Sequence, residues 1–357
     1  MKIVTVLGAR PQFIKAAAFS RAVDKIDNIE EIIIHTGQHY DQNMSDIFFE
    51  EMNIPKPKYS LQTGGKTHGA MTGQQLEQIE TIFLAEKPDL VLVYGDTNST
   101  LAGALAAAKL HIPVAHVEAG LRSFNKKMPE EINRILTDQI SEYLFVPSVD
   151  SKKNLLNEGI ADDKIFVVGD IMYDVSLYYK EKMIKPTWFD SLNLNNFVLC
   201  TIHRAENTDD VKRLANIFKG LELSGKEIIL PLHPRTLGKI NKYNITISEN
   251  IHIVKPVGYL EMVWLEVNSD LIVTDSGGVQ KEAYFHNKFC VTLRDETEWV
   301  ELVEQKLNEL VGDDSAQIAK AICKPSYTLF NKGIYGNGTT RKSIIEVLLK
   351  KMVAEES

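Results

Sequence analysis

Short apolar runs alternate with longer amphipathic runs along the whole chain, and the apolar runs are typical of strands buried on both faces. They are Ile3–Leu7, Ile32–His35, Leu90–Tyr94, Val114–Val117, Tyr143–Val146, Ile165–Val168, Phe197–Ile202, Glu227–Leu232, Ile251–Val254, Leu271–Thr274, Phe289–Leu293 and Glu309–Val311. Helical periodicity separates most of them, clearly over Gln75–Ala85 and Thr100–Leu110 and more weakly over Glu261–Asn268. Such alternation predicts an α/β fold with parallel sheets covered by helices on both faces.

The runs fall into two groups, separated by the polar and aromatic segment near residues 170–192, which contains a proline. We therefore expect two doubly wound, Rossmann-like domains, the first over residues 1–170 and the second over residues 171–337. The length of 357 residues agrees with two domains, because single hydrophobic cores stop growing at roughly 250–300 residues. The last amphipathic run, about 338–357, is expected to pack back on the first domain.

Composition narrows the class of protein. Hydrophobic residues make up 44% and charged residues 25%, and no apolar run approaches the ~20 residues of a membrane span, so we expect no membrane association. The net charge of −8, without a basic stripe, argues against a nucleic acid partner. The three cysteines are far apart, and two of them lie in apolar, strand-like runs, which favours buried free thiols. The N-terminal residues are typical of a first strand, so we expect no signal peptide. We expect a cytoplasmic protein and a homodimer.

Polar residues follow the predicted strands at the edge where parallel sheets bind ligands. The first half supplies mostly carboxylates, together with Arg10 and Lys15 at a strand–helix turn. The second half supplies mainly basic groups, His203-Arg204 and His233-Pro-Arg235, and a bare helix start at 275–278. If the two sheets face each other, both sets line one cleft.

The bare helix start lies in LIVTDSGGVQKEA, residues 271–283. A helix beginning at Ser276, Gly277 and Gly278 offers backbone N–H groups and partial positive charge to a phosphate. Glu282 follows about one turn later, where it can accept from a ribose hydroxyl. The alternative is an ordinary capped helix with Asp275 or Ser276 as N-cap. The nearby His203 and His233 pairs favour phosphate, since Arg grips phosphate and His donates a hydrogen bond or a proton.

Asp96, Glu118 and Glu131 are candidates for proton transfer, because each follows a predicted strand or begins a helix. The alternatives are an N-cap, a structural ion pair of Asp96 or Glu118 with Arg122, and simple dipole complementarity for Glu131. GGKT at 64–67 is no phosphate loop, because Ser60 stands where its first glycine belongs. No GxGxxG, HExxH or cysteine cluster occurs, so the sequence implies no metal or dinucleotide.

Several motifs resemble the non-hydrolysing UDP-N-acetylglucosamine 2-epimerases, from Met1 to about Asn337. They are GARPQFIK, GDTNSTLAGALAA, HVEAGLRS, PEEINR, HRAEN, LHPRT and TDSGGVQKEA, in this order. The resemblance implies a GT-B fold, two Rossmann-like domains with the active site between them. It also implies elimination of UDP to a 2-acetamidoglucal and re-addition with C2 inverted, without metal or NAD.

The resemblance also implies roles for individual residues. Asp96, Glu118 and Glu131 would be the catalytic carboxylates, with His203 as an assisting acid or base. Arg10 and Lys15 would contact the sugar and phosphate of the substrate. The residues that would hold UDP are Arg10, His233, Ser276, Gly277, Gly278 and Glu282.

Two segments depart from the usual pattern, Tyr40–Asp46 and RDETEWVEL from Arg294 onward. Both resemble the branch that acts on UDP-2,3-diacetamido-2,3-dideoxyglucuronate, used for O-antigen and capsule sugars. Its uronate carboxylate needs an extra cation, for which Lys126, Lys127 and Arg122 are candidates, although exposed lysines are also ordinary surface residues. The alternative functions are a hydrolysing epimerase that releases ManNAc and UDP, a GT-B glycosyltransferase, and a non-catalytic nucleotide-sugar sensor.

Overall fold

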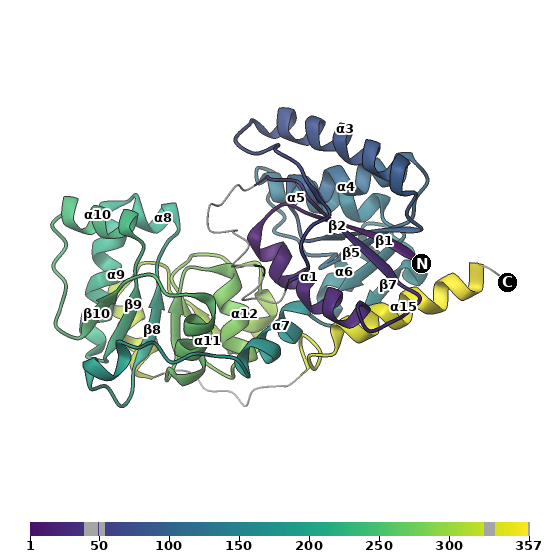
Figure 1. Ribbon diagram of the computed structural model, residues 1–357. Coiled ribbons are helices and arrows are strands. Elements are labelled where there is room, and N and C mark those ends of the chain that lie inside the picture. Colours follow the sequence, from purple (N-terminus) through teal and green to yellow (C-terminus); the bar gives the residue numbers. More distant parts are fainter. Residues whose placement is uncertain (39–48, 50–53, 325–332, 356–357) are drawn as a thin grey trace. The chain divides into compact units, whose positions relative to one another are not determined.

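The computed structural model describes residues 1–38, 49, 54–324 and 333–355. The chain divides into two compact units (Figure 1). Unit 1 comprises Met1–Val175 and Lys332–Ser357, and unit 2 comprises Ser176–Asn331. The departure over Tyr40–Asp46 lies outside the described residues.

Unit 1 contains a parallel sheet of seven described strands in the order β3-β2-β1-β4-β5-β6-β7. The strands are β1 (Lys2–Leu7), β2 (Glu30–His35), β3 (Tyr59–Ser60), β4 (Leu90–Tyr94), β5 (Val114–Val117), β6 (Tyr143–Val146) and β7 (Ile165–Val167). All six predicted strands of this half are confirmed, and β3 was missed because two residues carry no apolar pattern. The strand order reverses between β1 and β4, which makes their carboxyl ends the switch point where such sheets bind ligands.

Helices cover the sheet of unit 1. They are α1 (Arg10–Val23), α3 (His68–Glu86), α4 (Asn98–Lys109), α5 (Pro129–Ile140), α6 (Val149–Asn157), the first part of α7 (Ile171–Lys180) and α15 (Thr340–Glu355). The alanine-rich α4 lies close to β1, where a Cβ on Gly103 would stand 3.0 Å from the Cβ of Val6. The C-terminal helix α15 lies alongside α1 (Figure 1).

Unit 2 contains a parallel sheet of six described strands in the order β10-β9-β8-β11-β12-β13. The strands are β8 (Val198–Thr201), β9 (Ile228–Pro231), β10 (Ile251–Val254), β11 (Ile272–Thr274), β12 (Cys290–Thr292) and β13 (Asn308–Leu310). Its helices are α8 (Ala205–Thr208), α9 (Val211–Ser224), α10 (Pro234–Lys242), α11 (Tyr259–Asn268), α12 (Gly277–Phe285), α13 (Val300–Glu304) and α14 (Ser315–Cys323). The prediction of six strands here is confirmed, and the order reverses between β8 and β11.

The two units divide within helix α7, between Val175 and Ser176. The predicted boundary between residues 170 and 171 lies at the start of this helix. The carboxylate of Asp174, on α7, accepts the backbone N–H groups of Thr340 and Arg341 at 2.9 and 3.1 Å. This contact ties the start of α15 to unit 1, because it satisfies helix-end N–H groups that lack an intrahelical partner.

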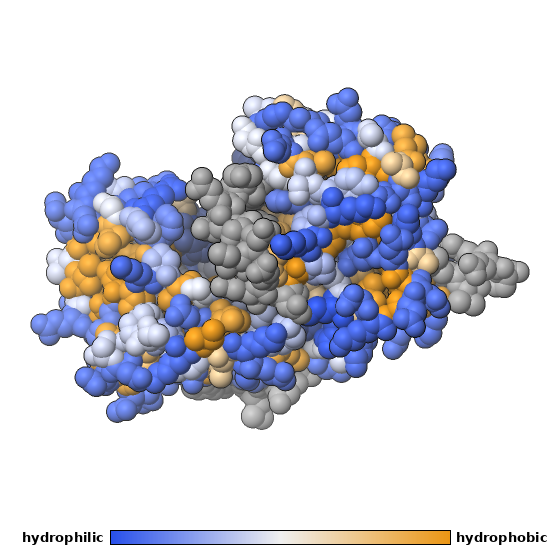
Figure 2. Space-filling model, in the orientation of Figure 1, coloured by the Kyte–Doolittle hydropathy of each residue, from blue (hydrophilic) through white to orange (hydrophobic). Residues whose placement is uncertain are grey.

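Hydrophilic side chains cover much of the visible surface, with apolar residues among them (Figure 2). The strands carry the apolar core, where Val4, Val91 and Val273 are fully buried. Among the described helices, none combines the length and apolar character needed to cross a membrane.

Candidate active site

A pocket of about 260 Å³ opens in unit 1, lined by residues that follow β1 and β4 and by the start of α5. The lining includes Gln12, Lys15, His68, Asp96, Asn98 and Asn133. The position at a switch point is where an open parallel sheet binds ligands. Lys15 and Asp96 were predicted for this edge, whereas Gln12, His68 and the two asparagines were missed.

Gln12 joins the ends of the two strands that flank the switch point. Its amide group donates to Tyr94 O at 2.6 Å, and its oxygen accepts from Gly8 N at 2.7 Å. A helical residue beside two strand ends cannot be recognised from strand patterns alone. The motif GARPQFIK contains Gln12 and is the sequence signal that points to it.

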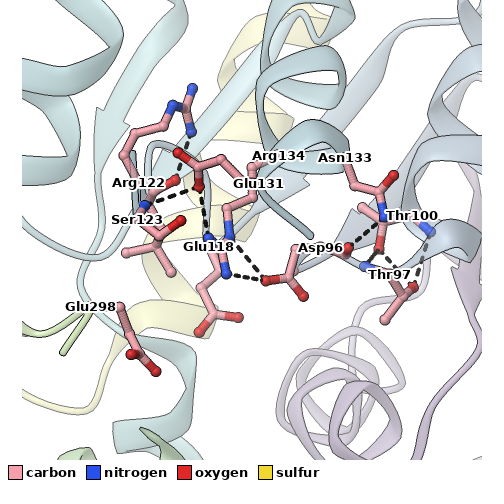
Figure 3. Close-up of polar contacts among 12 residues, drawn as sticks. Asp96, Thr97, Thr100, Glu118, Arg122, Ser123, Glu131, Asn133, Arg134 and Glu298 are labelled. Atoms are coloured by element: carbon pink, nitrogen blue, oxygen red, sulfur yellow. Dashed lines mark hydrogen bonds and ion pairs between the residues drawn. The ribbon is translucent and has the colours of Figure 1, made fainter. Parts of the chain in front are cut away.

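Asp96 follows β4 after Gly95. The φ of Gly95 is 64°, in the left-handed region that glycine adopts readily. Arg134 of α5 donates to the Asp96 carboxylate from Nε at 2.9 Å and from Nη2 at 2.6 Å (Figure 3). Asn133 donates to the backbone carbonyl of Asp96 at 2.9 Å. These hydrogen bonds fix the Asp96 side chain in place. Its carboxylate is still 30% exposed, so a ligand can reach it.

Glu118 follows β5 with a φ of 73°, which is rare for a residue with a side chain. Such backbone strain clusters at functional sites because the surrounding structure must hold it. Its carboxylate forms an ion pair with Lys15 of α1, and both side chains are largely buried. The structure therefore brings two of the predicted site residues, Glu118 and Lys15, into direct contact.

Glu131 differs from the other two carboxylates because it is 1% exposed. Its oxygens accept from the backbone N–H groups of Ser123 and Phe124 at 2.9 and 2.8 Å and from Arg134 at 2.9 Å (Figure 3). Burial alone would raise the pKa of Glu131, but these donors outweigh it and lower the pKa. In this structure Glu131 holds the loop after Arg122 and shares Arg134 with Asp96.

One alternative from the sequence was an ion pair of Arg122 with Asp96 or Glu118. Arg122 pairs with neither of them. Its guanidinium is 1% exposed and contacts Asp138 at 2.7 Å and Glu158 at 2.6 Å. This buried position is also wrong for a uronate contact, because both carboxylates already engage the cation. Lys126 and Lys127 are exposed.

In unit 2, Asp275 follows β11 and is fully buried. Its carboxylate accepts the backbone N–H groups of His203 and Arg204 at 3.0 Å, and Asn207 Nδ2 donates at 3.2 Å. The ring Nδ1 of His203 also lies 3.0 Å from Asp275. Burial alone would raise the pKa of Asp275, but the bonds and charge of His203, with the other donors, lower it. Asp275 thus orients the exposed ring of His203.

The start of α12 combines the two interpretations that the sequence left open. Ser276 is the N-cap, since its Oγ accepts from Val279 N at 3.4 Å. Gly277 and Gly278 then form the first turn, where N–H groups have no intrahelical partner. A Cβ on Gly277 would collide with the Glu298 carboxylate, whereas a Cβ on Gly278 would make only an ordinary contact with Ser276 Oγ, at 3.9 Å.

The RDETEWVEL segment folds against this helix start, which the sequence did not predict. Arg294 donates to Glu298 at 2.8 Å, and Trp299 Nε1 donates to the Gly277 carbonyl at 2.8 Å. Lys281 Nζ lies 4.2 Å from the centre of the Trp299 ring, a cation–π geometry.

His233, a predicted UDP contact, is exposed and caps α10, with Nδ1 accepting from Arg235 N at 3.2 Å.

Glu282 is partly buried and interacts with two buried residues, Glu266 and His286. Desolvation raises the pKa of Glu282 and of Glu266 to about 8, and the charge of Glu266 raises the pKa of Glu282 further. His286 Nε2 lies 3.5 Å from Glu266, and burial lowers the pKa of His286 to about 4. The two carboxyl groups therefore hold at least one proton at neutral pH. Among the residues that the structure describes, no group of three or more His, Cys, Asp or Glu is arranged to hold a metal ion.

Three comparisons relate this chain to known proteins. A family model described as UDP-N-acetylglucosamine 2-epimerase matches residues 21–349. The UDP-2,3-diacetamido-2,3-dideoxy-D-glucuronate 2-epimerase of Pseudomonas aeruginosa is 52% identical, over 98% of this chain and 100% of that protein. The UDP-GlcNAc 2-epimerase of Methanocaldococcus jannaschii, crystallised with UDP-GlcNAc and UDP, is 48% identical with a TM-score of 0.85, over 98% of this chain and 100% of that one.

Replacing Gly277 by Val should weaken UDP binding if the α12 start receives the diphosphate. A branched side chain would stand between the N–H groups and the anion, and each lost charge-assisted hydrogen bond costs about 1.5–3 kcal/mol, roughly tenfold to a hundredfold in affinity. Calorimetry with UDP checks this. The Gly277→Val/Glu298→Ala pair removes the collision with Glu298, and Gly238→Val is the control in α10. Full UDP affinity in the folded double variant would reject the anion site.

The buried Glu266–Glu282 pair should make unfolding depend on pH. A carboxyl pKa raised from 4.5 in the unfolded chain to about 8 means that the folded state holds more protons between those values. The free energy of unfolding therefore falls as the pH rises from about 4.5 to 8. Glu266→Gln should flatten this dependence, measured by urea unfolding, while the exposed Glu249→Gln should not. Equal slopes in all three proteins would contradict the raised pKa values of these carboxyl groups.

Proposed function

This chain belongs to the UDP-N-acetylglucosamine 2-epimerase family, and we propose that it inverts C2 of a UDP-2-acetamido sugar by eliminating UDP and adding it back. Its homologues are epimerases, so the enzyme is an isomerase. The expected GT-B class is confirmed by two doubly wound parallel sheets and by the solved relatives. The observation that carries the proposal is the pair of fixed carboxylates, Asp96 and Glu118, after neighbouring strands of unit 1.

The chemistry needs more than one proton-transfer group. C2 bears the acetamido nitrogen and no carbonyl, so its proton is weakly acidic, and departure of UDP must be helped by charge stabilisation. A base removes H2, the C1–O bond breaks with its electron pair leaving on UDP, and a C1–C2 double bond forms. Proton return to the opposite face requires a second group. Asp96 and Glu118 are the proposed pair, with His203 assisting.

The remaining carboxylate and the cations have supporting roles in the proposal. Glu131 belongs to the same set, and it acts in this structure through Arg134 and the loop that it holds. Arg10 and Lys15 meet the sugar and phosphate, and Lys15 offsets the charge of Glu118.

UDP is assigned to unit 2. The diphosphate would contact Ser276, Gly277 and Gly278, with Glu282 on the ribose and His233 as a further contact. Support comes from the free N–H groups expected at a helix start and from the uncrowded surroundings of Gly278. The M. jannaschii relative was crystallised with UDP-GlcNAc and UDP.

We place the substrate in the diacetamido-uronate branch, with UDP-GlcNAc as the second candidate. Two observations support this branch: the EWVEL departure resembles it, and the P. aeruginosa diacetamido-uronate 2-epimerase is 52% identical to this chain. Lys126 and Lys127 remain the candidate cations for the uronate. A role in O-antigen or capsule synthesis, a cytoplasmic location and a homodimer stay predictions.

Separate incubations with the two UDP sugars test the function. We expect a UDP-linked C2 epimer in each productive reaction, formed faster from the diacetamido uronate, with no free sugar, as measured by chromatography and NMR. Free ManNAc with UDP would instead indicate hydrolysis. A product formed only after addition of an acceptor would indicate a glycosyltransferase, and UDP binding without any epimer would indicate a sensor.

A further inference from the structure

His116 is a fully buried histidine whose two ring nitrogens both face hydrogen-bond acceptors. It lies on β5, with Nδ1 2.7 Å from Asp138 Oδ1 and Nε2 2.8 Å from the backbone carbonyl of Gly95. A neutral imidazole carries one N–H and one lone pair, so it satisfies only one acceptor. Its lone pair would then point at an oxygen in a site without water access.

The other contacts of Asp138 locate the additional proton. Its Oδ2 accepts from Gly120 N at 3.1 Å and lies 2.7 Å from Arg122 Nη1. These donors stabilise the ionised carboxylate. The proton between the two side chains therefore belongs to the ring of His116 and not to Asp138.

An imidazolium at His116 is compatible with the charges around it. Arg122 contacts both Asp138 and Glu158, so two carboxylates face one guanidinium. With a protonated His116 the four groups add to zero net charge, and solvent shares the charge of Glu158, whose side chain is 28% exposed.

We propose that His116 is an imidazolium positioning residue that fixes the turns carrying Asp96 and Glu118 relative to α5. This inference rests on the proposed function, because it assigns chemistry to those two carboxylates. The ring has no exposed surface, so it acts through its neighbours and does not touch substrate.

Three chain segments meet at His116 and Asp138. The Gly95 carbonyl belongs to the turn that leads directly into Asp96. Gly120, held by Asp138, closes the turn that begins at Glu118. Asp138 itself is on α5, the helix whose Asn133 and Arg134 bind Asp96 from the other side. Loss of this tie should displace both turns, and a displacement of about 1 Å can cost a hundredfold in rate.

NMR of the full-length protein with ¹⁵N-labelled histidine rings tests the protonation directly at neutral pH. We expect one ring with N–H groups on both nitrogens, absent from the spectrum of His116→Gln. Asp138→Asn should convert that ring to a single N–H. A His116 ring with one N–H in the unmodified protein would overturn the inference. If His116→Gln does not fold, through-space contacts of the ring to the Gly95 and Asp138 neighbourhood assign it in the unmodified protein.

Kinetics test the positioning role. His116→Gln and Asp138→Asn should lower kcat about tenfold to a hundredfold, with KM and UDP affinity near those of the parent enzyme. The matched control is His252→Gln, since His252 also pairs with a carboxylate, Glu227 at 2.6 Å, on β10 of unit 2. Unchanged kcat in a folded His116→Gln, or an equal loss in the control, would contradict the proposal.

The proposed function and the proposed role of His116 can be refuted independently of each other. If the unmodified protein epimerises neither UDP sugar, the proposed function is wrong, and the doubly protonated ring is still observed or refuted by NMR. If the enzyme is active and His116 carries one N–H, the inference alone is wrong.

Discussion

Buried carboxylates that bind the segments after parallel strands hold the candidate sites together. Strand ends gather at one edge of each sheet, and their polar groups must be satisfied without water. In unit 2, Asp275 does this by accepting N–H groups from the segment that follows β8. In unit 1, Asp138 accepts from Gly120 and contacts His116 and Arg122. Removing either carboxylate would leave several buried donors unpaired, at about 1–3 kcal/mol each.

Ion pairs also hold the candidate catalytic carboxylates of unit 1 in fixed positions. Asp96 is bound by Arg134, Glu118 by Lys15, and the strained backbone of Glu118 persists because its surroundings hold it. Charges placed before substrate arrives need little reorganisation during reaction, which is the main source of electrostatic catalysis. The carboxylates differ in access, since Asp96 is partly exposed and Glu131 is enclosed. This difference favours Asp96 for direct contact with substrate.

Strand content could be predicted from sequence because apolar runs at regular spacing report burial directly. β3 has two residues and offers no such pattern. Residues at strand ends, such as Asp96 and Glu118, could be found because chain order places them at the ligand edge. Their partners could not, because pairing depends on helix packing and rotamers. Arg122 shows this, since one alternative paired it with Asp96 or Glu118, and it instead contacts Asp138.

The central claim is that proton transfer at C2 accompanies reversible loss of UDP. Running the reaction in D₂O and following C2 of the product by NMR tests it most directly. We expect the product epimer to carry deuterium at C2, because the proton held by an enzyme carboxylate exchanges with solvent before a proton returns to C2. A product that retains full protium at C2 would contradict the account.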